Sequence, residues 1–463
     1  MQIQSFINST FQKSSSIFTK MNPFTVEALH LVEASEVMHV VQSIQGSQKA
    51  FLDWKNTSFV ERIELLTKIK NSLVQNKTEY AKLEALDQGL PIHFVLEHGI
   101  QAAIASFERA IDQLQNFSHN DNQIVFANGV TVIVTSWNLS LRVICERLAP
   151  ALAAGNSVIV KVSSWSPVTA FILGQIAINA QMPSGLIQVL VSNQKDMQEL
   201  LITHPGVKAV SFVGNLKNSS DVLKKISSQS LNQFKKIQIA SGSKNSAVAL
   251  NSPIETNFNE IISSFMTGQG QLSWNSNRLF VLEKHEAEWV EKIKNYFTEV
   301  LPAQDIEDTS LWSPCLKPES FIQFSEIENL AIKDQAQLIQ AKHPLTATQK
   351  NCYLRPTFTK DMSNCSTLQQ DQVLAPLFIL SVVKYPFDIA KYSNVSYYGQ
   401  SAHIWAEESK IPKIAEQLEV AQVFKNKWSA QCHLPNKGVK QSGFGLQDYQ
   451  VFGDFFSNVK KIT

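Results

Sequence analysis

Residues 262–281, ISSFMTGQGQLSWNSNRLFV, have the composition of a loop that could present a reactive group. Gly270 lies between two glutamines, and glycine lets a backbone come close to a reacting centre because it has no side chain. Ser273 follows with a hydroxyl, but a serine needs an adjacent base before it can serve as a nucleophile. Arg278 then opens a run that favours a strand. The pattern predicts a loop in which Ser273 is either a nucleophile or an inert residue.

Other kinds of chemistry find little support. The chain has ten histidines, and none has a second ligand at metal-binding spacing, so we expect them to be core or surface residues. The sequence contains no P-loop, no nucleophile elbow and no His-Glu-x-x-His segment. The histidines considered as ligands are His204, His285, His403 and His433.

Composition indicates a globular protein with large cores. The chain has 463 residues, of which 44% are hydrophobic, so it can form two or three domains. Lysine and arginine number 41 and aspartate and glutamate 40, so the charge does not favour nucleic acid or an acidic membrane as a partner. Only 17 of the 463 residues are glycine, which is well below the usual share of about 7% of the residues in a chain. Glycine is therefore scarce for a protein that must bring backbone close to phosphates.

Cysteine usage and the absence of targeting segments favour a cytoplasmic protein. The five cysteines show neither Cys-x-x-Cys nor metal-like spacing, which is typical of reduced thiols. No apolar run approaches the roughly eighteen residues of a membrane span. The first twenty residues are serine-rich with Lys13 and Lys20, faintly like a transit peptide, but they lack arginine, and we expect a plain N-terminal arm. The cysteines are Cys145, Cys315, Cys352, Cys365 and Cys432.

Helical periodicity dominates the first quarter of the chain. Apolar residues recur at helical spacing, which predicts amphipathic helices over about residues 35–54, 58–75 and 95–114. Gly89 and Pro91 suit a helix end, since glycine favours a C-cap and proline follows it.

Strands alternate with helices after this helical region. Residues 124–133 contain β-branched residues around Gly129 and predict a hairpin. Residues 130–213 then predict four strands separated by three helices, which calls for a parallel sheet in a doubly wound α/β domain. A second α/β set follows Gly242 as far as Trp428, and the tail ends in a strand.

Several segments together resemble the aldehyde dehydrogenase superfamily, in the family's order and spacing. The resemblance covers about residues 22–462 and implies two doubly wound α/β domains with a small β oligomerisation element. The segments that carry it are the opening loop with Gly270, Gln271 and Arg278, NPF at Asn22, ERLAPALAAGNSVIVK, MPSGLIQVL, HPGVKAVSFVGN, YLRPT, SNVSYYGQSAHIW and GVKQSGFG.

The resemblance assigns catalytic roles to three positions. Ser273 lies where the family has its cysteine nucleophile, and Ala240 where it has its general-base glutamate. Asn138 matches the asparagine that holds the oxyanion, although an asparagine after a strand is equally an ordinary turn residue. Gly242 and Lys244 remain from the family's motif and are explained by a turn and by a lysine that is either solvated or pins the loop.

The resemblance also implies a site for the adenosine half of NAD or NADP. Trp137 precedes the oxyanion position, and Lys161 ends a strand where the family's lysine bonds the ribose. Ser164 replaces the glutamate of NAD-preferring members, which would remove the repulsion of a 2′-phosphate.

Other cofactor positions depart from the family's pattern. Gly214 is retained, but Asn215 and Ser219 replace a smaller serine and a glycine at the start of the phosphate-binding helix. Gln372 replaces a ribose-binding glutamate, and Leu374 replaces a phenylalanine beside the nicotinamide. These changes predict weak or absent dinucleotide binding.

The expected organisation is a dinucleotide-type domain over 1–114 and 130–240, a catalytic-type domain over 241–435, and an oligomerisation element over 115–129 and 436–463. By resemblance, that element pairs a hairpin with the terminal strand and makes a homodimer; a tetramer or association with an active paralogue are alternatives. The loss of both cysteine and glutamate predicts a catalytically impaired pseudoenzyme with a binding, scaffold or regulatory role. The alternatives are an NAD(P)-dependent aldehyde dehydrogenase with a non-standard active site and a serine-based hydrolase.

Overall fold

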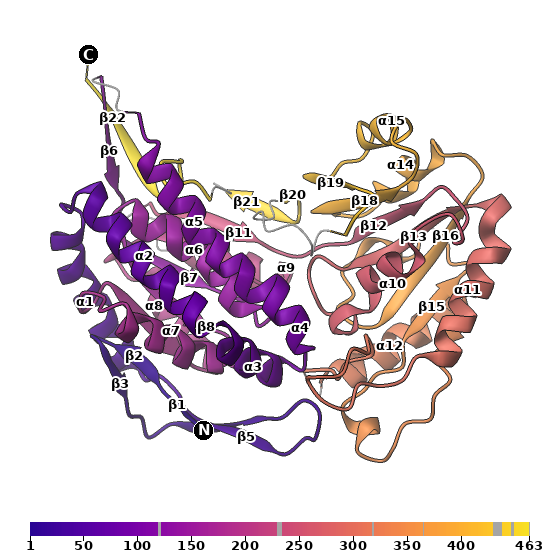
Figure 1. Cartoon of the computed structure of the whole chain (residues 1–463), viewed down its shortest axis with the longest axis horizontal. Helices are drawn as coiled ribbons and strands as arrows, with labels where there is room; N and C mark the ends of the chain where they lie inside the picture. Colours follow the sequence, from indigo (N-terminus) through magenta and orange to yellow (C-terminus); the bar gives the residue numbers. More distant parts are fainter. Residues whose placement is uncertain are drawn as a thin grey trace.

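The computed structural model describes residues 1–118, 122–228, 234–316, 319–363, 365–428, 438–445 and 449–462. Figure 1 shows two lobes, each a β-sheet with helices packed on it, and a narrow ribbon that projects from the first lobe. Cys432 and His433 lie outside the described residues.

The first lobe is built on an eight-stranded sheet in the order β21-β11-β10-β7-β8-β9-β2-β3. Its five central strands pair in parallel and its edge strands are antiparallel. β7 and β9 are buried along their whole length because helices cover both faces. The strands are β2 (Ser5–Ile7), β3 (Thr10–Gln12), β7 (Val130–Val134), β8 (Ser157–Val162), β9 (Ile187–Val191), β10 (Val207–Val213), β11 (Lys236–Ala240) and β21 (Gly443–Gly445).

Helices α2, α5, α6 and α7 cover one face of this sheet, and α1, α8 and α9 cover the other. Ser58 caps α2 in a reciprocal capping box with Glu61, and Gly89 ends α3 with φ +69°, as its sequence position predicts. The helices are α1 (Val37–Trp54), α2 (Phe59–Gln75), α3 (Lys77–Gln88), α4 (Ile92–Phe94), the π-helix η1 (Val95–Ile100), α5 (Gln101–Gln115), α6 (Ser140–Ala153), α7 (Val168–Asn179), α8 (Lys195–Thr203) and α9 (Leu216–Ser228).

The second lobe contains a seven-stranded sheet in the order β14-β15-β16-β13-β12-β18-β19, parallel except for β14. Helices α10 and α11 pack through the aromatic rings of Phe258, Phe265 and Trp289. The strands are β12 (Asn245–Ala249), β13 (Ser276–Leu282), β14 (Gln337–Gln340), β15 (Thr357–Lys360), β16 (Leu377–Val383), β18 (Ser401–Trp405) and β19 (Gln422–Lys425). The helices are α10 (Phe258–Met266), η2 (Thr267–Gly270), η3 (Glu283–His285), α11 (Glu286–Glu299), α12 (Glu319–Lys333), η4 (Gln349–Asn351), α13 (Thr367–Gln370), α14 (Asp388–Ser393) and α15 (Ile411–Ala415).

The predicted hairpin over residues 124–133 is wrong. Among the described residues, β6 (Gln123–Ala127) pairs only with the terminal strand β22 (Ser457–Lys461), whereas β7 enters the large sheet between β10 and β8. The pairing of this region with the terminal strand is confirmed, and the two strands form the projecting ribbon in Figure 1.

The N-terminal residues are not a plain arm. β2 pairs with β9 at the edge of the large sheet and buries Phe6 and Ile7. β1 (Gln2–Ile3), β4 (Ile17–Met21) and β5 (Ala28–Glu33) form a separate three-stranded sheet. A further small pair joins β17 (Tyr398–Gly399) to β20 (Val439–Lys440). Within the described ranges, no helix combines the length and apolar character that crossing a membrane requires.

Candidate active site

The loop between α10 and β13 has the close backbone approach that its glycines predict. Gly268, Gln269 and Gly270 all have positive φ values, of 60°, 55° and 66°. A Cβ on Gly270 would lie 2.7 Å from the carbonyl oxygen of Ala375, so a larger residue would clash with backbone there. The loop therefore depends on glycine at this position.

Asn275 holds the loop through its buried side-chain amide. Its Nδ2 donates to the carbonyl oxygens of Ser264 (2.9 Å) and Thr267 (3.1 Å), and its Oδ1 accepts from the N–H of Leu272 (2.8 Å). Gln269 adds a second anchor, because its Nε2 donates to the carbonyl of Leu354 at 2.8 Å. These side chains satisfy backbone groups that regular structure would otherwise pair. Sequence analysis missed both, because the partner of Gln269 lies in another segment and the partners of Asn275 are brought to it only by the folding of the loop.

Ser273 lies at the end of this loop, on a cavity of about 330 Å³. Its backbone carbonyl accepts from Ser243 Oγ and from Asn245 Nδ2, the latter at 3.1 Å. Its hydroxyl makes no hydrogen bond to the described residues. Ala240, at the end of β11, lines the same cavity and contributes only a methyl group. The structure thus brings the two expected catalytic positions to one cavity.

Asn138 also lines this cavity, just before α6. Its Nδ2 donates to the carbonyl of Gln271 at 2.7 Å, and its Oδ1 has no hydrogen-bond partner among the described residues. One N–H of the amide is thus used by the loop, and the other is left for a ligand oxygen. Trp137 is buried beside it and lines the cavity too.

Lys161 and Ser164 extend the cavity along the carboxyl end of β8. Burial lowers the pKa of Lys161 to about 8. Lys195 and Gln198, from α8, line the same region, and sequence analysis missed them. The signal that could have found them is their place at the start of a helix that follows β9, where α/β sheets bind ligands.

The N-terminus of α9 is partly self-satisfied. Gly214 and Asn215 line the cavity before this helix, and Asn215 Oδ1 accepts from the N–H of Asn218 at 2.8 Å. The Asn215 carbonyl also accepts from Ser219 Oγ at 2.9 Å. One of the backbone donors that could hold a pyrophosphate is therefore already used by the helix's own cap.

Gln372 and Leu374 also line the cavity from the second lobe. Gly242 has φ +114°, and a Cβ there would lie 2.6 Å from Oε1 of Gln372. The Gln372 side chain thus packs directly on bare backbone. Leu374 is 37% exposed.

Arg278 and Lys244 are buried and are not among the residues that line the cavity. Arg278 donates to the carbonyl of Lys244 at 2.8 Å and to Ser246 Oγ at 3.1 Å, and burial lowers its pKa to about 9. Lys244 Nζ has no hydrogen-bond partner among the described residues, and burial together with the Arg278 charge lowers the Lys244 pKa. Arg278 therefore ties the strands of the second lobe together.

The ionisable groups of the cavity are few. Of the described residues that line it, only Lys161 and Lys195 are titratable, so no carboxylate, imidazole or thiol lines it. The part of the chain that the structure describes also contains no group of three His, Cys, Asp or Glu side chains suited to a metal ion. The cavity can offer hydrogen bonds and positive charge, but its described lining offers no carboxylate or histidine base.

Comparison with known proteins agrees with the fold. The model of the aldehyde dehydrogenase family matches residues 11–462, so the chain belongs to that family. It is 25% identical to 2-aminomuconic semialdehyde dehydrogenase of Danio rerio and 25% identical to that of Homo sapiens, and each match covers 100% of this chain and 98% of the relative.

Solved structures show the same fold. An aldehyde dehydrogenase from Bartonella henselae superimposes with a TM-score of 0.89 at 22% identity, covering 100% of this chain and 99% of that one. An indole-3-acetaldehyde dehydrogenase in complex with NAD+ gives a TM-score of 0.89 at 21% identity, with 100% and 97% coverage. The expected architecture, with two α/β sheets, is thereby confirmed.

Proposed function

We propose that this member of the aldehyde dehydrogenase family is catalytically silent toward aldehydes and acts as a binding, scaffold or regulatory subunit. The observation that carries the proposal is the cavity at Ser273, whose described ionisable lining is limited to two lysines. Oxidation through a thiohemiacetal needs a thiolate and a base that activates water. An alcohol beside the methyl group of Ala240 provides neither.

The cavity fits a dinucleotide only in part. Lys161 could hold a ribose hydroxyl, and a bound NAD or NADP would supply a hydride acceptor. Two features oppose tight binding. The Asn215 side chain already accepts from a backbone N–H at the start of α9 that could hold a phosphate, and the Gln372 side chain, unlike a glutamate, carries no charge. We therefore propose weak or absent binding of NAD and NADP.

A second candidate is a working NAD(P)-dependent aldehyde dehydrogenase that converts an aldehyde to a carboxylic acid. The names of the relatives favour it, since those similar to this chain are semialdehyde and aldehyde dehydrogenases and one solved neighbour holds NAD+. Asn138 supports it as well, because one N–H of its amide is left for a ligand oxygen.

Reduced-nicotinamide absorbance separates the two candidates. Purified protein is incubated with NAD or NADP and a panel of aldehydes, and we expect no turnover above background. Turnover typical of enzymes, on the order of 1 s⁻¹ or more, would establish the second candidate and contradict the first. Calorimetric titration with each dinucleotide tests binding independently, and a low-micromolar dissociation constant would contradict weak binding.

A rescue experiment tests the cause of silence. Ser273→Cys combined with Ala240→Glu restores a thiol and a carboxylate on the same cavity. We expect the double variant to reduce NAD or NADP measurably at high cofactor concentration, while Ser273→Cys alone forms a thiohemiacetal without sustained turnover. A silent double variant with a reactive thiol would place the defect in dinucleotide binding.

The projecting ribbon supports a homodimer. Ile124, Phe126 and Val459 expose 45%, 46% and 48% of their surface on β6 and β22, which is costly for an isolated two-stranded ribbon. A tetramer and a complex with an active paralogue remain the alternatives. Light scattering on Phe126→Lys tests this element, and we expect monomers where the parent protein is dimeric.

A further inference from the structure

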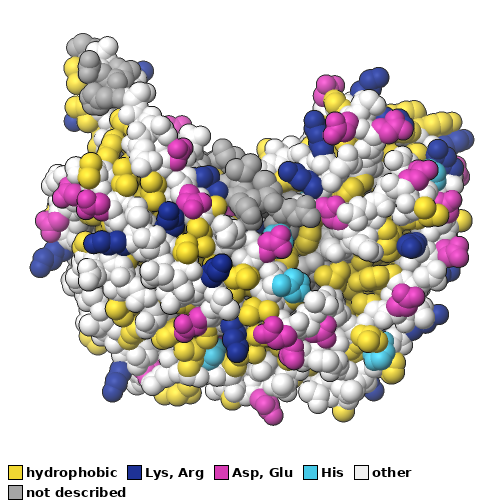
Figure 2. All heavy atoms as spheres, viewed as in Figure 1, with side chains coloured by type: hydrophobic (Ala, Val, Ile, Leu, Met, Phe, Trp, Pro, Cys, Tyr) yellow, Lys and Arg dark blue, Asp and Glu magenta, His cyan; other side chains and the backbone are white. Residues whose placement is uncertain are grey.

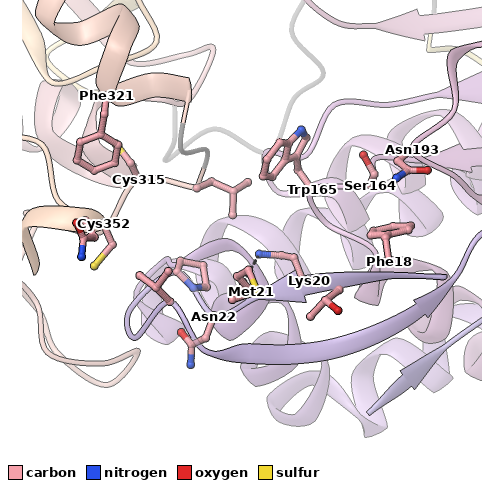
Figure 3. A pocket seen from close by; sticks show the side chains of 15 residues that line it. Phe18, Lys20, Met21, Asn22, Ser164, Trp165, Asn193, Cys315, Phe321 and Cys352 are labelled. Carbon is pink, nitrogen blue, oxygen red and sulfur yellow. Dashed lines mark hydrogen bonds between the residues drawn. The ribbon is translucent and has the colours of Figure 1, made fainter. Parts of the chain in front are cut away.

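A second cavity, of about 350 Å³, lies where β4 and its following turn meet the second lobe. Figure 3 shows side chains from both lobes around it. Ser164 and Trp165 line this cavity and the Ser273 cavity alike, but the remaining lining residues differ. We call it the Lys20 pocket. Its volume falls within the range of about 300–1,000 Å³ that small-molecule sites occupy.

The wall of the Lys20 pocket is mainly apolar. It combines aromatic rings with aliphatic side chains, and such a wall favours an apolar ligand surface. The apolar side chains are Phe18, Met21, Pro23, Val26, Trp165, Leu316 and Phe321. None of these residues has a catalytic role in the proposal above.

Lys20 places a charge in this apolar setting. The residue is only 4% exposed, and in Figure 3 its amine is directed among the lining side chains. The amine donates to the carbonyl of Met21 at 2.9 Å, which uses one of its three donors. Burial lowers the Lys20 pKa, and Asp87 opposes that shift from beyond ion-pair distance. Within the described residues, no carboxylate lies within 4.0 Å of the amine.

An anion stabilises a buried ammonium that has two N–H groups without a hydrogen-bond acceptor, because the anion supplies those acceptors. A carboxylate fits this requirement, because its two oxygens accept charge-assisted hydrogen bonds. A phosphate fits less well, since the pocket supplies one cation and its wall is mostly apolar. Asp87 offsets only part of the cost of burying the Lys20 charge, so a neutralising ligand gains affinity from the pairing.

We propose that the Lys20 pocket binds a small carboxylic acid with an apolar tail. The carboxylate pairs with the Lys20 amine, and the tail packs against the apolar wall of the pocket, which includes Trp165. The site is separate from the Ser273 cavity and does not depend on whether that cavity is catalytic.

Calorimetric titration with octanoate and with octanol tests the proposal. The two molecules have the same chain length and differ in charge. We expect one octanoate to bind per chain, at least tenfold more tightly than octanol. No binding of octanoate at millimolar concentration, or equal binding of octanol, would contradict the proposal.

Lys20→Met locates the site, since methionine keeps the apolar stem and removes the charge. We expect it to weaken octanoate at least tenfold and to leave octanol unchanged. Lys13→Met is the matched control, because Lys13 is exposed on the same N-terminal segment. An equal loss in both variants would point to general electrostatic attraction and overturn the assignment.

Two further measurements keep the test decisive if Lys20→Met does not fold. Met21→Trp narrows the pocket from a residue that is 43% exposed, so it should fold and weaken octanoate. Ala240→Trp narrows the Ser273 cavity, whose lining includes Ala240 while that of the Lys20 pocket does not, and it should leave octanoate affinity unchanged. A loss of octanoate binding in Ala240→Trp would place the acid in the Ser273 cavity and overturn the proposal, whereas failure of octanoate to bind the parent protein would leave the proposed function of Ser273 unaffected.

Discussion

Two segments border the Ser273 cavity and show how differently its parts are held. The loop before β13 is anchored by Asn275 and Gln269, whose amides bond backbone groups at 2.8–3.1 Å. The end of β11 contributes Ala240, a methyl, and the residues that follow it include Gly242, on which the Gln372 side chain packs. The loop conformation therefore depends on side chains that take no part in chemistry. A fold of this kind can retain its loop while its reactive groups change.

Removing the Asn275 side chain, which anchors the loop before β13, should have the largest effect on the stability of the fold. Asn275→Ala eliminates three buried hydrogen bonds of 3.1 Å or shorter and leaves carbonyls unpaired. We expect a loss of about 2–4 kcal/mol in the free energy of unfolding. Urea titration with an unchanged m-value measures it. Asn193→Ala is the control, because Asn193 is exposed, and should change stability by less than about 0.5 kcal/mol. A loss below about 1 kcal/mol for Asn275→Ala would show that the loop is held elsewhere.

His403 tests the layer behind the loop. It is fully buried on β18, its Nδ1 lies 3.2 Å from Ser276 Oγ, and Ser276 bonds Ser264 in α10. Burial lowers the pKa of His403 to about 3, below its unfolded value of about 6.5. The folded state thus binds fewer protons between these values, and the stability from neutral His403 is lost as pH falls through this window.

The pH dependence is best measured as a difference between variants. At pH 5 the loss attributable to His403 is about 2 kcal/mol, from 1.5 pH units at about 1.36 kcal/mol each. His403→Gln should therefore lose less stability than the parent between pH 7 and pH 5. The pKa of Asp87 is raised to about 6 by burial, which acts in the opposite direction, so total stability alone is a poor measure. Parallel curves for the two proteins would contradict the assignment.

Lys244 tests the segment that follows β11. Its amine is 2% exposed and has no hydrogen-bond partner among the described residues, and the Arg278 charge opposes its protonation. Lys244→Met should stabilise the fold by about 1–2 kcal/mol, because it removes a buried charge. Thermal unfolding measures this, with the exposed Lys284→Met as control. A destabilisation would indicate that Asp371, which attracts the charge, compensates it.

A contrast between local patterns and long-range pairing explains what the sequence could predict. Helix periodicity and the strand–helix alternation predicted the parallel strands of the first sheet and the existence of a second α/β set, because these patterns are local. The supposed hairpin at residues 124–133 failed because strand propensity does not reveal the partner, and β6 pairs with a strand more than 300 residues away. Short strands such as β2, with three residues, were missed for lack of a repeating pattern.

The candidate site divides in a similar way. Ser273, Ala240, Asn138, Lys161 and Gln372 could be placed together by resemblance, and they line one cavity. The anchoring roles of the loop amides could not be predicted, since Gln269 bonds a carbonyl in a distant segment and Asn275 bonds groups that come together only when the loop folds. The capping of α9 by Asn215 could have been foreseen, because an asparagine three residues before a helical N–H is a known N-cap pattern.

Ser273→Ala should have the smallest effect on the free energy of unfolding. It tests whether the Ser273 hydroxyl takes part in holding the loop or in any chemistry. The hydroxyl makes no hydrogen bond to the described residues, whereas the Ser273 carbonyl, which the substitution keeps, holds Ser243 and Asn245. We expect a change within about 0.5 kcal/mol in unfolding free energy. Any slow ester hydrolysis by the protein should also be unchanged, because an alcohol without a base is a poor nucleophile. If Ser273→Ala abolished such an activity, the hydroxyl would be activated by a group outside the described lining, and the protein would be a serine-dependent catalyst.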